Sequence, residues 1–196
     1  MSHFRSIAGP RNDRKWDIPC RNWDKPACAP TAGQNGGVVD AGSASALIDA
    51  ARRRLAGQRQ ERLGDHAAAR RLLGFGRAPR IVPVGSAWHL GVLLIADDAV
   101  FATGEILRAR EEVIRGFAAE SQRQRAATAA AAFRGGFRDG ETVHLGWAPI
   151  DLAAVDAGGS SGPLSVAADG TPIVRWSAAG GTRDLAGYVD DQLSLR

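Results

Sequence analysis

Two different periods of apolar residues follow one another along this chain, and their order constrains the fold more than any other feature. After residue 42, apolar side chains first recur at the three-to-four spacing of a helix, which should end at Gly57. Residues 80–107 then alternate as strands do, and an alanine-rich stretch at 118–134 returns to the helical spacing before a Gly-Gly pair. Because the strands come in pairs between helices, the pattern predicts an α+β fold, in which a small antiparallel or mixed sheet packs against three to four helices.

The same pattern predicts individual elements. Pro83 cannot donate a hydrogen bond to a sheet ladder, so we expect residues 80–85 to form an edge strand. Residues 87–95 are apolar on both alternating faces, which is typical of a central strand covered on both sides. A turn over 96–99 should lead into a partner strand at 100–107. The other expected elements are helices at 43–57, 65–73 and 182–195, a strand at 143–147, and a hairpin of 164–167 with 173–176.

The first 42 residues differ in composition from the rest. They hold both lysines, both cysteines and four of the nine prolines, and they show no apolar period, which predicts a disordered N-terminal tail. Seven residues separate Cys20 from Cys28, a spacing that matches no common zinc motif, so we expect two unpaired thiols. The predicted organisation is therefore a tail at 1–42, a basic helical segment at 43–79 and an α+β core domain at 80–196.

No segment of the sequence is suited to a membrane. The longest uninterrupted apolar stretch, Leu90–Ala96, is far shorter than the roughly 20 residues that a spanning helix needs. The N-terminus carries no apolar core of a secretory signal. We therefore expect a cytoplasmic protein without a membrane partner.

Positive charge is concentrated in one stretch. Nine arginines lie between Arg52 and Arg80 against two acidic residues, whereas the chain from Ile81 onward carries more acidic than basic residues. Such a segment can contact a polyanion, for example the phosphates of a nucleic acid. The alternative is that it folds against the acidic remainder of the same protein. The candidate anion-binding residues are Arg52, Arg53, Arg54, Arg59, Arg62, Arg70 and Arg71.

One short motif suggests nucleophilic catalysis. Residues 158–162 read Gly-Gly-Ser-Ser-Gly, which fits the G-x-S-x-G spacing of a nucleophile elbow and resembles the core of the amidase-signature family. Ser160 or Ser161 with His144 would then form an amide-bond hydrolase. However, Pro163 and an expected strand follow the motif instead of a helix, and no histidine follows His144. The alternative is a flexible loop between strands.

The remaining chemistry-bearing residues are scattered. No two of the four histidines are three or four residues apart, so the sequence predicts no metal site, and without a phosphate-binding glycine loop it predicts no cofactor. His89 and His144 both fall in expected strands, where they could face each other and share a pocket with Glu105 or Glu141. The alternative is that both rings are buried and bonded to the backbone. The tryptophans of the expected strands should fill the core: Trp88, Trp147 and Trp176.

Four segments carry a family resemblance: Ala87–Ile95, Phe101–Ile106, Phe133–Phe137 and Val143–Trp147. On these residues the chain, from about Ala46 onward, resembles a family of short uncharacterised proteins from high-GC bacteria, some of which are labelled glutaminase. The resemblance implies hydrolysis of the glutamine amide but brings no catalytic residues with it.

The known glutaminase chemistries do not map onto these residues. Serine-dependent glutaminases use a Ser-x-x-Lys pair, yet the residues three before Lys15 and Lys25 are asparagines. Cysteine-dependent ones need a cysteine with histidine and glutamate, and both cysteines lie in the tail. The sequence therefore favours a binding or interaction domain for an anionic partner, with a small amide-bond hydrolase as the alternative.

Overall fold

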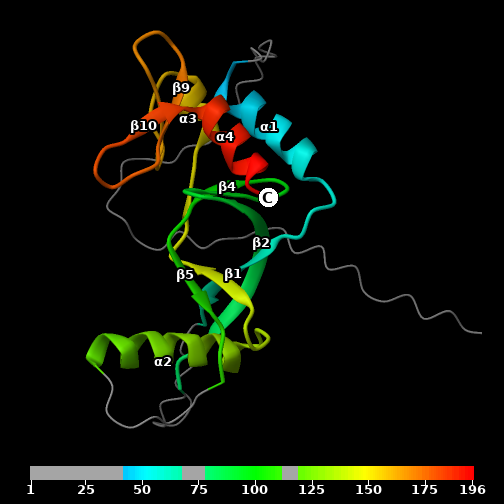
Figure 1. The fold of residues 1–196 in the computed structure, drawn as a ribbon, viewed down its shortest axis with the longest axis vertical. Coiled ribbons are helices and arrows are strands. Elements are labelled where there is room, and N and C mark those ends of the chain that lie inside the picture. The colour runs from blue at the N-terminus through cyan, green and yellow to red at the C-terminus, as the bar shows by residue number, and fades with distance from the viewer. Residues whose placement is uncertain (1–41, 68–77, 112–118) are drawn as a thin grey trace, which may run out of the picture. The chain divides into compact units, whose positions relative to one another are not determined.

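The computed structural model describes residues 42–67, 78–111 and 119–196, and the predicted α+β class is confirmed (Figure 1). These ranges contain four helices and two sheets, one of seven strands and one of three. The larger sheet is mixed, as expected, but it is bigger than the small sheet that the sequence pattern suggested.

The seven-stranded sheet has the order β5-β6-β1-β2-β3-β4-β7. Its strands are β1 (Glu61–His66), β2 (Ile81–Leu90), β3 (Leu93–Ile95), β4 (Val100–Ala102), β5 (Glu105–Arg108), β6 (Thr142–Leu145) and β7 (Ala148–Pro149). Neighbours pair antiparallel with one exception, because β1 and β6 run parallel. This pairing joins residues more than eighty positions apart in the sequence.

The three-stranded sheet is antiparallel in the order β10-β9-β8. It comprises β8 (Leu164–Val166), β9 (Pro172–Arg175) and β10 (Thr182–Asp184). The predicted hairpin between β8 and β9 is confirmed, and Gly170 supplies the positive φ of +88° in its turn.

The helices lie at two ends of the strands (Figure 1). At one end, α1 (Ala44–Leu55) packs on the short α3 (Leu152–Asp156) and on α4 (Leu185–Ser194). At the other end, α2 (Glu120–Gly135) packs on β2. The predicted boundaries of α1 and α2 hold, because the Ser43 hydroxyl caps α1 and Gly136, with a φ of +109°, ends α2.

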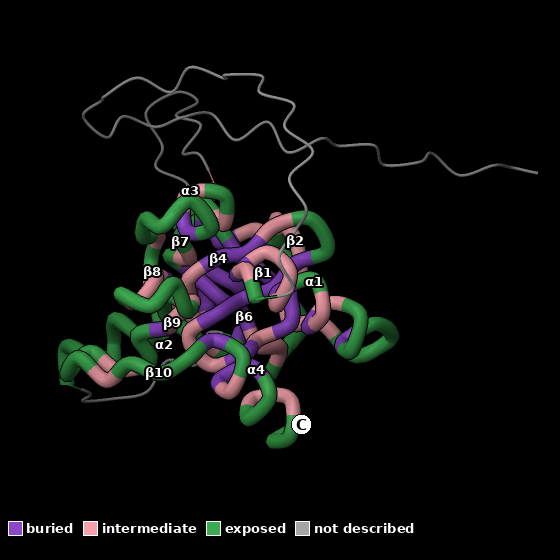
Figure 2. Tube along the Cα trace, turned by 90° about the horizontal axis from the view of Figure 1, so that it is seen from above, coloured by how far each residue is buried: buried purple, intermediate pink, exposed green. Residues whose placement is uncertain are grey.

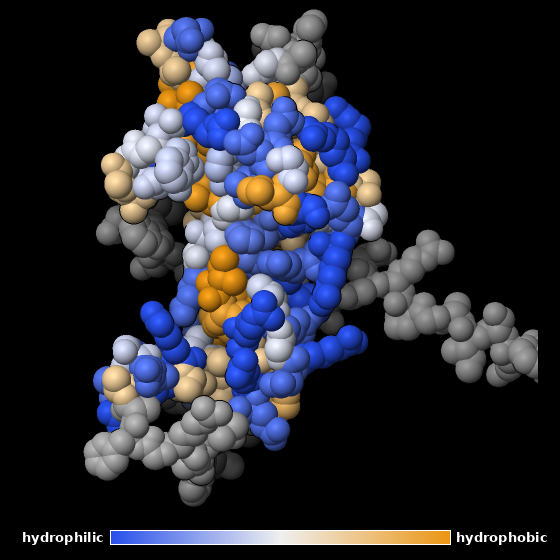
Figure 3. Space-filling view, viewed as in Figure 1, coloured by the Kyte–Doolittle hydropathy of each residue, from blue (hydrophilic) through white to orange (hydrophobic). Residues whose placement is uncertain are grey.

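Buried residues gather inside the described part of the chain, around β1, β4 and β6 (Figure 2). The largest cluster joins α1 and α4 to β2 and β3, with Ile48, Leu90 and Leu185 fully buried. Trp88 belongs to this core, but Trp176 is 53% exposed, so the expectation that it fills the core was wrong. The face in Figure 3 is mostly hydrophilic and carries its apolar side chains in small patches.

The structure corrects three of the predicted elements. Residues 65–66, expected to begin a helix, end strand β1, whose backbone pairs with β2 on one side and β6 on the other. Residues 87–95 are not one strand, because Gly91 has a φ of +59° and turns the chain between β2 and β3. The edge strand expected at 80–85 is the first part of a longer strand, β2: around Pro83 it pairs with β1 alone among the described strands, as an edge position does, and β3 joins it at Trp88–Leu90.

The predicted tail at 1–42, both cysteines and the rest of the helix expected at 65–73 fall almost entirely outside the described residues. Among the helices that the structure describes, none is long and apolar enough to cross a membrane.

Candidate functional site

Three strands bring Glu61, His89 and His144 to the same face of the larger sheet. Glu61, the first residue of β1, lies opposite Ala87 of β2, and Leu63 lies beside His144 of β6. Side chains two positions apart on a strand point to the same face, so Ala87 shares its face with His89 and Leu63 shares its face with Glu61. The sheet register therefore places the carboxylate between the two imidazole rings.

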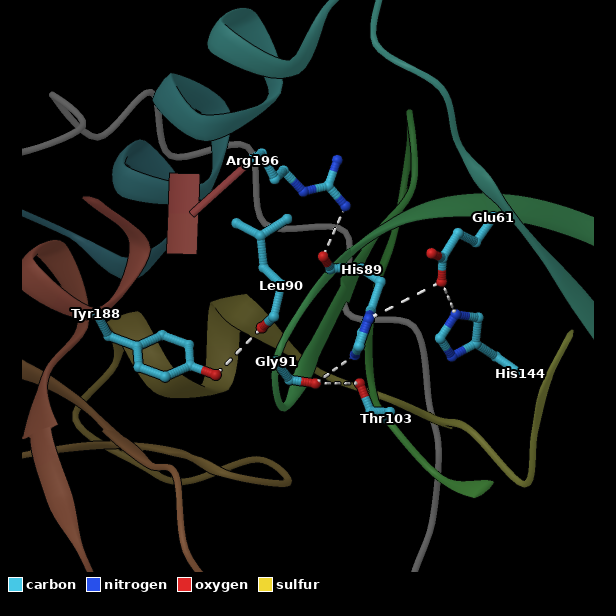
Figure 4. Close-up of polar contacts among 8 residues, drawn as sticks. All are labelled: Glu61, His89, Leu90, Gly91, Thr103, His144, Tyr188 and Arg196. Atoms are coloured by element: carbon cyan, nitrogen blue, oxygen red, sulfur yellow. Dashed lines mark hydrogen bonds and ion pairs between the residues drawn. The ribbon is translucent and has the colours of Figure 1, made fainter. Parts of the chain in front are cut away.

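Glu61 is the centre of this histidine–carboxylate cluster (Figure 4). Its Oε2 lies 2.6 Å from Nε2 of His144 and 3.9 Å from Nδ1 of His89. The two rings are tilted against each other with their centroids 4.8 Å apart. Only the shorter of the two distances to the carboxylate is a hydrogen bond, so the two histidines are held differently.

The His89 ring is fixed by the backbone of the β2–β3 turn. Its Nε2 lies 2.8 Å from the carbonyl oxygen of Gly91, which also accepts a hydrogen bond from the Thr103 hydroxyl. A carbonyl oxygen can only accept, so Nε2 carries the proton of this ring. In the neutral ring, Nδ1 therefore carries no proton, and its lone pair lies on the side of Glu61.

His144 is completely buried, with 0% of its side chain exposed. Burial is the main influence on the pKa of this imidazole and lowers it, nearby His89 lowers it further, and the hydrogen bond to Glu61 opposes the shift. The ring is therefore neutral and donates its Nε2–H to the carboxylate. Its Nδ1 is buried and has no hydrogen-bond partner among the residues that the structure describes.

The cluster opens into a pocket of about 570 Å³ whose wall is rich in arginine. Arginines in this wall are Arg59, Arg62, Arg108 and Arg196, and the other charged or titratable residues are Glu61, Glu141 and His89. Arg196 donates to the His89 carbonyl at 2.7 Å. None of the other three has an acidic partner among residues 42–67, 78–111 and 119–196.

The predicted anion-binding arginines do not share one surrounding. Arg52 bonds to Asp49 and to the Ala96 carbonyl, and Arg54 forms an ion pair with Asp190, so both are committed to the protein's own surface. Arg53 is exposed on α1, and Arg70 and Arg71 lie outside the described residues. The remaining two of the predicted set are Arg59 and Arg62. They flank Glu61 in the sequence, and both line the pocket.

The candidate serines lie in the loop between α3 and β8. The Ser161 hydroxyl accepts a hydrogen bond from the Asp151 N–H at 2.8 Å, and Ser160 is exposed. His144 bonds to Glu61, and in the described part of the chain no hydrogen bond joins it to either serine. The serine-hydrolase hypothesis therefore stays a prediction, without support from this geometry.

Sequence reasoning found part of this site. It considered that His89 and His144 could face each other and share a pocket with Glu105 or Glu141, and of these two glutamates Glu141 lines the pocket. The alternative also holds in part, because His144 is buried and His89 bonds to a backbone carbonyl. It missed Glu61, because residues 61–66 were read as part of a basic helical segment. Gly64 argued against a helix, but glycine is depleted in strands as well, so no local signal identified Glu61.

The arrangement can do two things chemically. Its three unpaired guanidinium groups can bind an anion, and its carboxylate with two imidazoles can hold a proton or a cation beside that anion. No protein-family model, curated protein or solved structure matches the chain.

Proposed function

We propose that this protein binds a small anionic molecule in its arginine-lined pocket. The observation that carries the proposal is that Arg59, Arg62 and Arg108 line one pocket, and none of them has an ion-pair partner in the described ranges. Four arginines against two glutamates leave the pocket wall with an excess of positive charge, which attracts anions. Guanidinium groups bind carboxylates and phosphates with paired, directional hydrogen bonds.

The shape of the site favours a small molecule over an extended polyanion. A pocket of about 570 Å³ lies in the size range of ordinary small-molecule sites. Glu61 and Glu141 line the same pocket as the arginines, and they would repel a chain of closely spaced phosphates. The same carboxylates can accept hydrogen bonds from a hydroxyl, amide or ammonium group. We therefore expect a ligand with an anionic group at one end and a hydrogen-bond donor at the other.

Thermal unfolding and isothermal titration calorimetry in a chelating buffer test the proposal without any metal contribution. The probes are inorganic phosphate and pyrophosphate for a phosphoryl ligand, and glutamate and citrate for a carboxylate ligand. Glutamine tests the glutaminase label of the family that the chain resembles. A probe at 100 times its dissociation constant should stabilise the protein by about 2.7 kcal/mol, and the gain should shrink between about 20 and 300 mM salt.

Matched variants separate the pocket from the general charge of the arginine-rich segment. Arg62→Gln and Arg108→Gln should each weaken binding of the best probe about tenfold or more, because each removes a charged hydrogen bond. Arg53→Gln removes the same charge from α1 and should leave the affinity within about twofold. Equal losses in all three variants, or binding only to a short DNA duplex, would contradict a small-molecule pocket.

A further inference from the structure

Two imidazole nitrogens and one carboxylate oxygen converge at the cluster, and each comes from a different strand. The three donor atoms of Glu61, His89 and His144 all lie within 4.8 Å of one another. Two ligand atoms of a tetrahedral zinc ion, each about 2.0 to 2.2 Å from the metal, are roughly 3.4 Å apart. Glu61 and His89 are 34% and 25% exposed, so their side chains have room to close the difference. We infer that these three residues form a binding site for a divalent first-row transition metal ion, with zinc as the ion that fits best.

The position of His89 is the first support for a cation. Its Nε2–H is held by the Gly91 carbonyl, so its Nδ1 presents an electron pair to a carboxylate 3.9 Å away. Two electron-rich atoms that face each other at this distance share no hydrogen bond unless the ring takes up a second proton. A metal ion between them resolves the repulsion. Ligating histidines typically donate their other N–H to a backbone carbonyl, and His89 does so here.

His144 supplies the second support. In the metal-free protein its Nε2–H donates to Glu61, so a metal can take Nε2 only if that proton moves. Nδ1 has no partner and can carry the proton, which leaves the ring neutral before and after the ion binds. The new N–H would be buried without an acceptor, and missing outer partners cost about 10- to 100-fold in affinity. We therefore expect micromolar rather than picomolar affinity.

The donor set selects the class of ion. Imidazole and carboxylate ligands suit zinc, iron and related transition metals, whereas magnesium and calcium prefer oxygen ligands alone. Three protein donors leave at least one position of a four-coordinate ion for a ligand. Glu61 and His89 are part of the pocket wall, so a ligand at that position would come from the pocket. The ion and the arginines would then both attract an anion. The metal site itself is inferred from its three donor atoms and does not depend on anion binding.

Isothermal titration of the full-length chain with zinc chloride tests this inference. Thiols also bind zinc, so the parent protein carries Cys20→Ser and Cys28→Ser. We expect one zinc ion per chain and no measurable binding of magnesium. His89→Gln, His144→Gln and Glu61→Gln should each weaken zinc binding at least tenfold. His66→Gln is the matched control, because His66 is an exposed histidine on the same strand as Glu61, and it should retain the parent affinity.

Two results would overturn the site. One is the absence of zinc binding in the parent protein, and the other is unchanged one-to-one binding in His89→Gln. His89→Gln is the decisive variant because its side chain is partly exposed, so its replacement should not prevent folding. Circular dichroism of each variant confirms the fold. Anion binding is measured separately in a chelating buffer. A failure to bind anions would therefore not contradict the metal site, and a failure to bind zinc would not contradict the anion pocket.

Discussion

The protein buries two polar side chains in opposite ways. Tyr188 of α4 is 6% exposed, and its hydroxyl is fully satisfied by backbone: it accepts from the Val92 N–H at 2.8 Å and donates to the Leu90 carbonyl at 3.2 Å. His144 is buried more completely, yet it makes one hydrogen bond, to a carboxylate that lines a pocket. Tyr188 joins a helix to a turn, whereas His144 holds the Glu61 carboxylate at the wall of a pocket.

Tyr188 and His89, a neighbour of His144 in the cluster, contact the same turn. The Gly91 carbonyl accepts from His89, and the Gly91 Cα faces the Tyr188 hydroxyl (Figure 4). The turn between β2 and β3 therefore has two roles. It binds the Tyr188 hydroxyl, a contact called the tyrosine anchor below, and it holds the His89 ring of the histidine–carboxylate cluster. Variants at the turn and at Tyr188 should consequently lower the free energy of unfolding, whereas a variant at His144 should mainly lower the zinc affinity.

Gly91→Ala should have the largest effect. A Cβ at this position would lie 2.1 Å from the Tyr188 hydroxyl, and the φ of +59° is unfavourable for alanine. We expect a loss of about 3 kcal/mol or more in the free energy of unfolding, measured by urea denaturation. Gly57→Ala is the control, because Gly57 also has a positive φ but open space around it, and it should lose only about 1 kcal/mol. Equal losses would show that the contact with Tyr188 contributes nothing.

Tyr188→Phe should cost about 1 to 3 kcal/mol, because it leaves the Val92 N–H without its acceptor. Zinc and anion affinities should stay within about twofold of the parent protein, since the hydroxyl contacts neither the cluster nor the pocket. Urea denaturation and calorimetry on the same preparation check both statements. A large loss of zinc affinity would mean that the anchor and the cluster are one unit.

Alkaline pH should weaken the anchor gradually. Burial raises the pKa of the Tyr188 hydroxyl above its ordinary value of 10.0, and the hydrogen bond from Val92 opposes the shift. The unfolded chain therefore loses this proton first, so stability is complete below pH 10 and falls as the pH rises toward the pKa of the folded state. Tyr188 is the one tyrosine of the chain, so the ultraviolet absorbance of tyrosinate reports it directly. A stability curve that matches that of Tyr188→Phe above pH 10 would contradict the raised pKa.

His144→Leu should have the smallest effect on stability, less than about 1 kcal/mol at pH 8. The substitution removes one hydrogen bond together with the cost of burying an imidazole, and the partly exposed Glu61 can be hydrated instead. Zinc binding should be lost in the same variant. A loss as large as that of Tyr188→Phe would instead make His144 a structural residue.

Sequence reasoning succeeded where the signal was local. The helix at 43–57, the end of α2 at a Gly-Gly pair and the β8–β9 hairpin each depend on residues that are close in the sequence, and each was predicted. It failed where pairing over a long distance decided the outcome. Glu61 reaches His144 only because β1 runs parallel to β6, and no local pattern announces that partner.

The candidate site shows the same limit. That His89 and His144 could face each other was one of two alternatives, and it followed from the strand in which each was expected, which is a local property. The carboxylate considered beside them was Glu105 or Glu141, whereas the strand order brings Glu61 there. The turn at Gly91 was missed because apolar residues continue on both sides of it, so the pattern favoured one uninterrupted strand.

The most direct test of the account is the anomalous difference density at the zinc absorption edge, measured on crystals of the full-length protein grown with zinc. The account predicts one peak bounded by Glu61 Oε2, His89 Nδ1 and His144 Nε2, with ligand distances of about 2.0 to 2.2 Å. Zinc density only at other residues, or none where the cluster is fully ordered, would contradict it and would leave His144 as a buried histidine that merely positions Glu61.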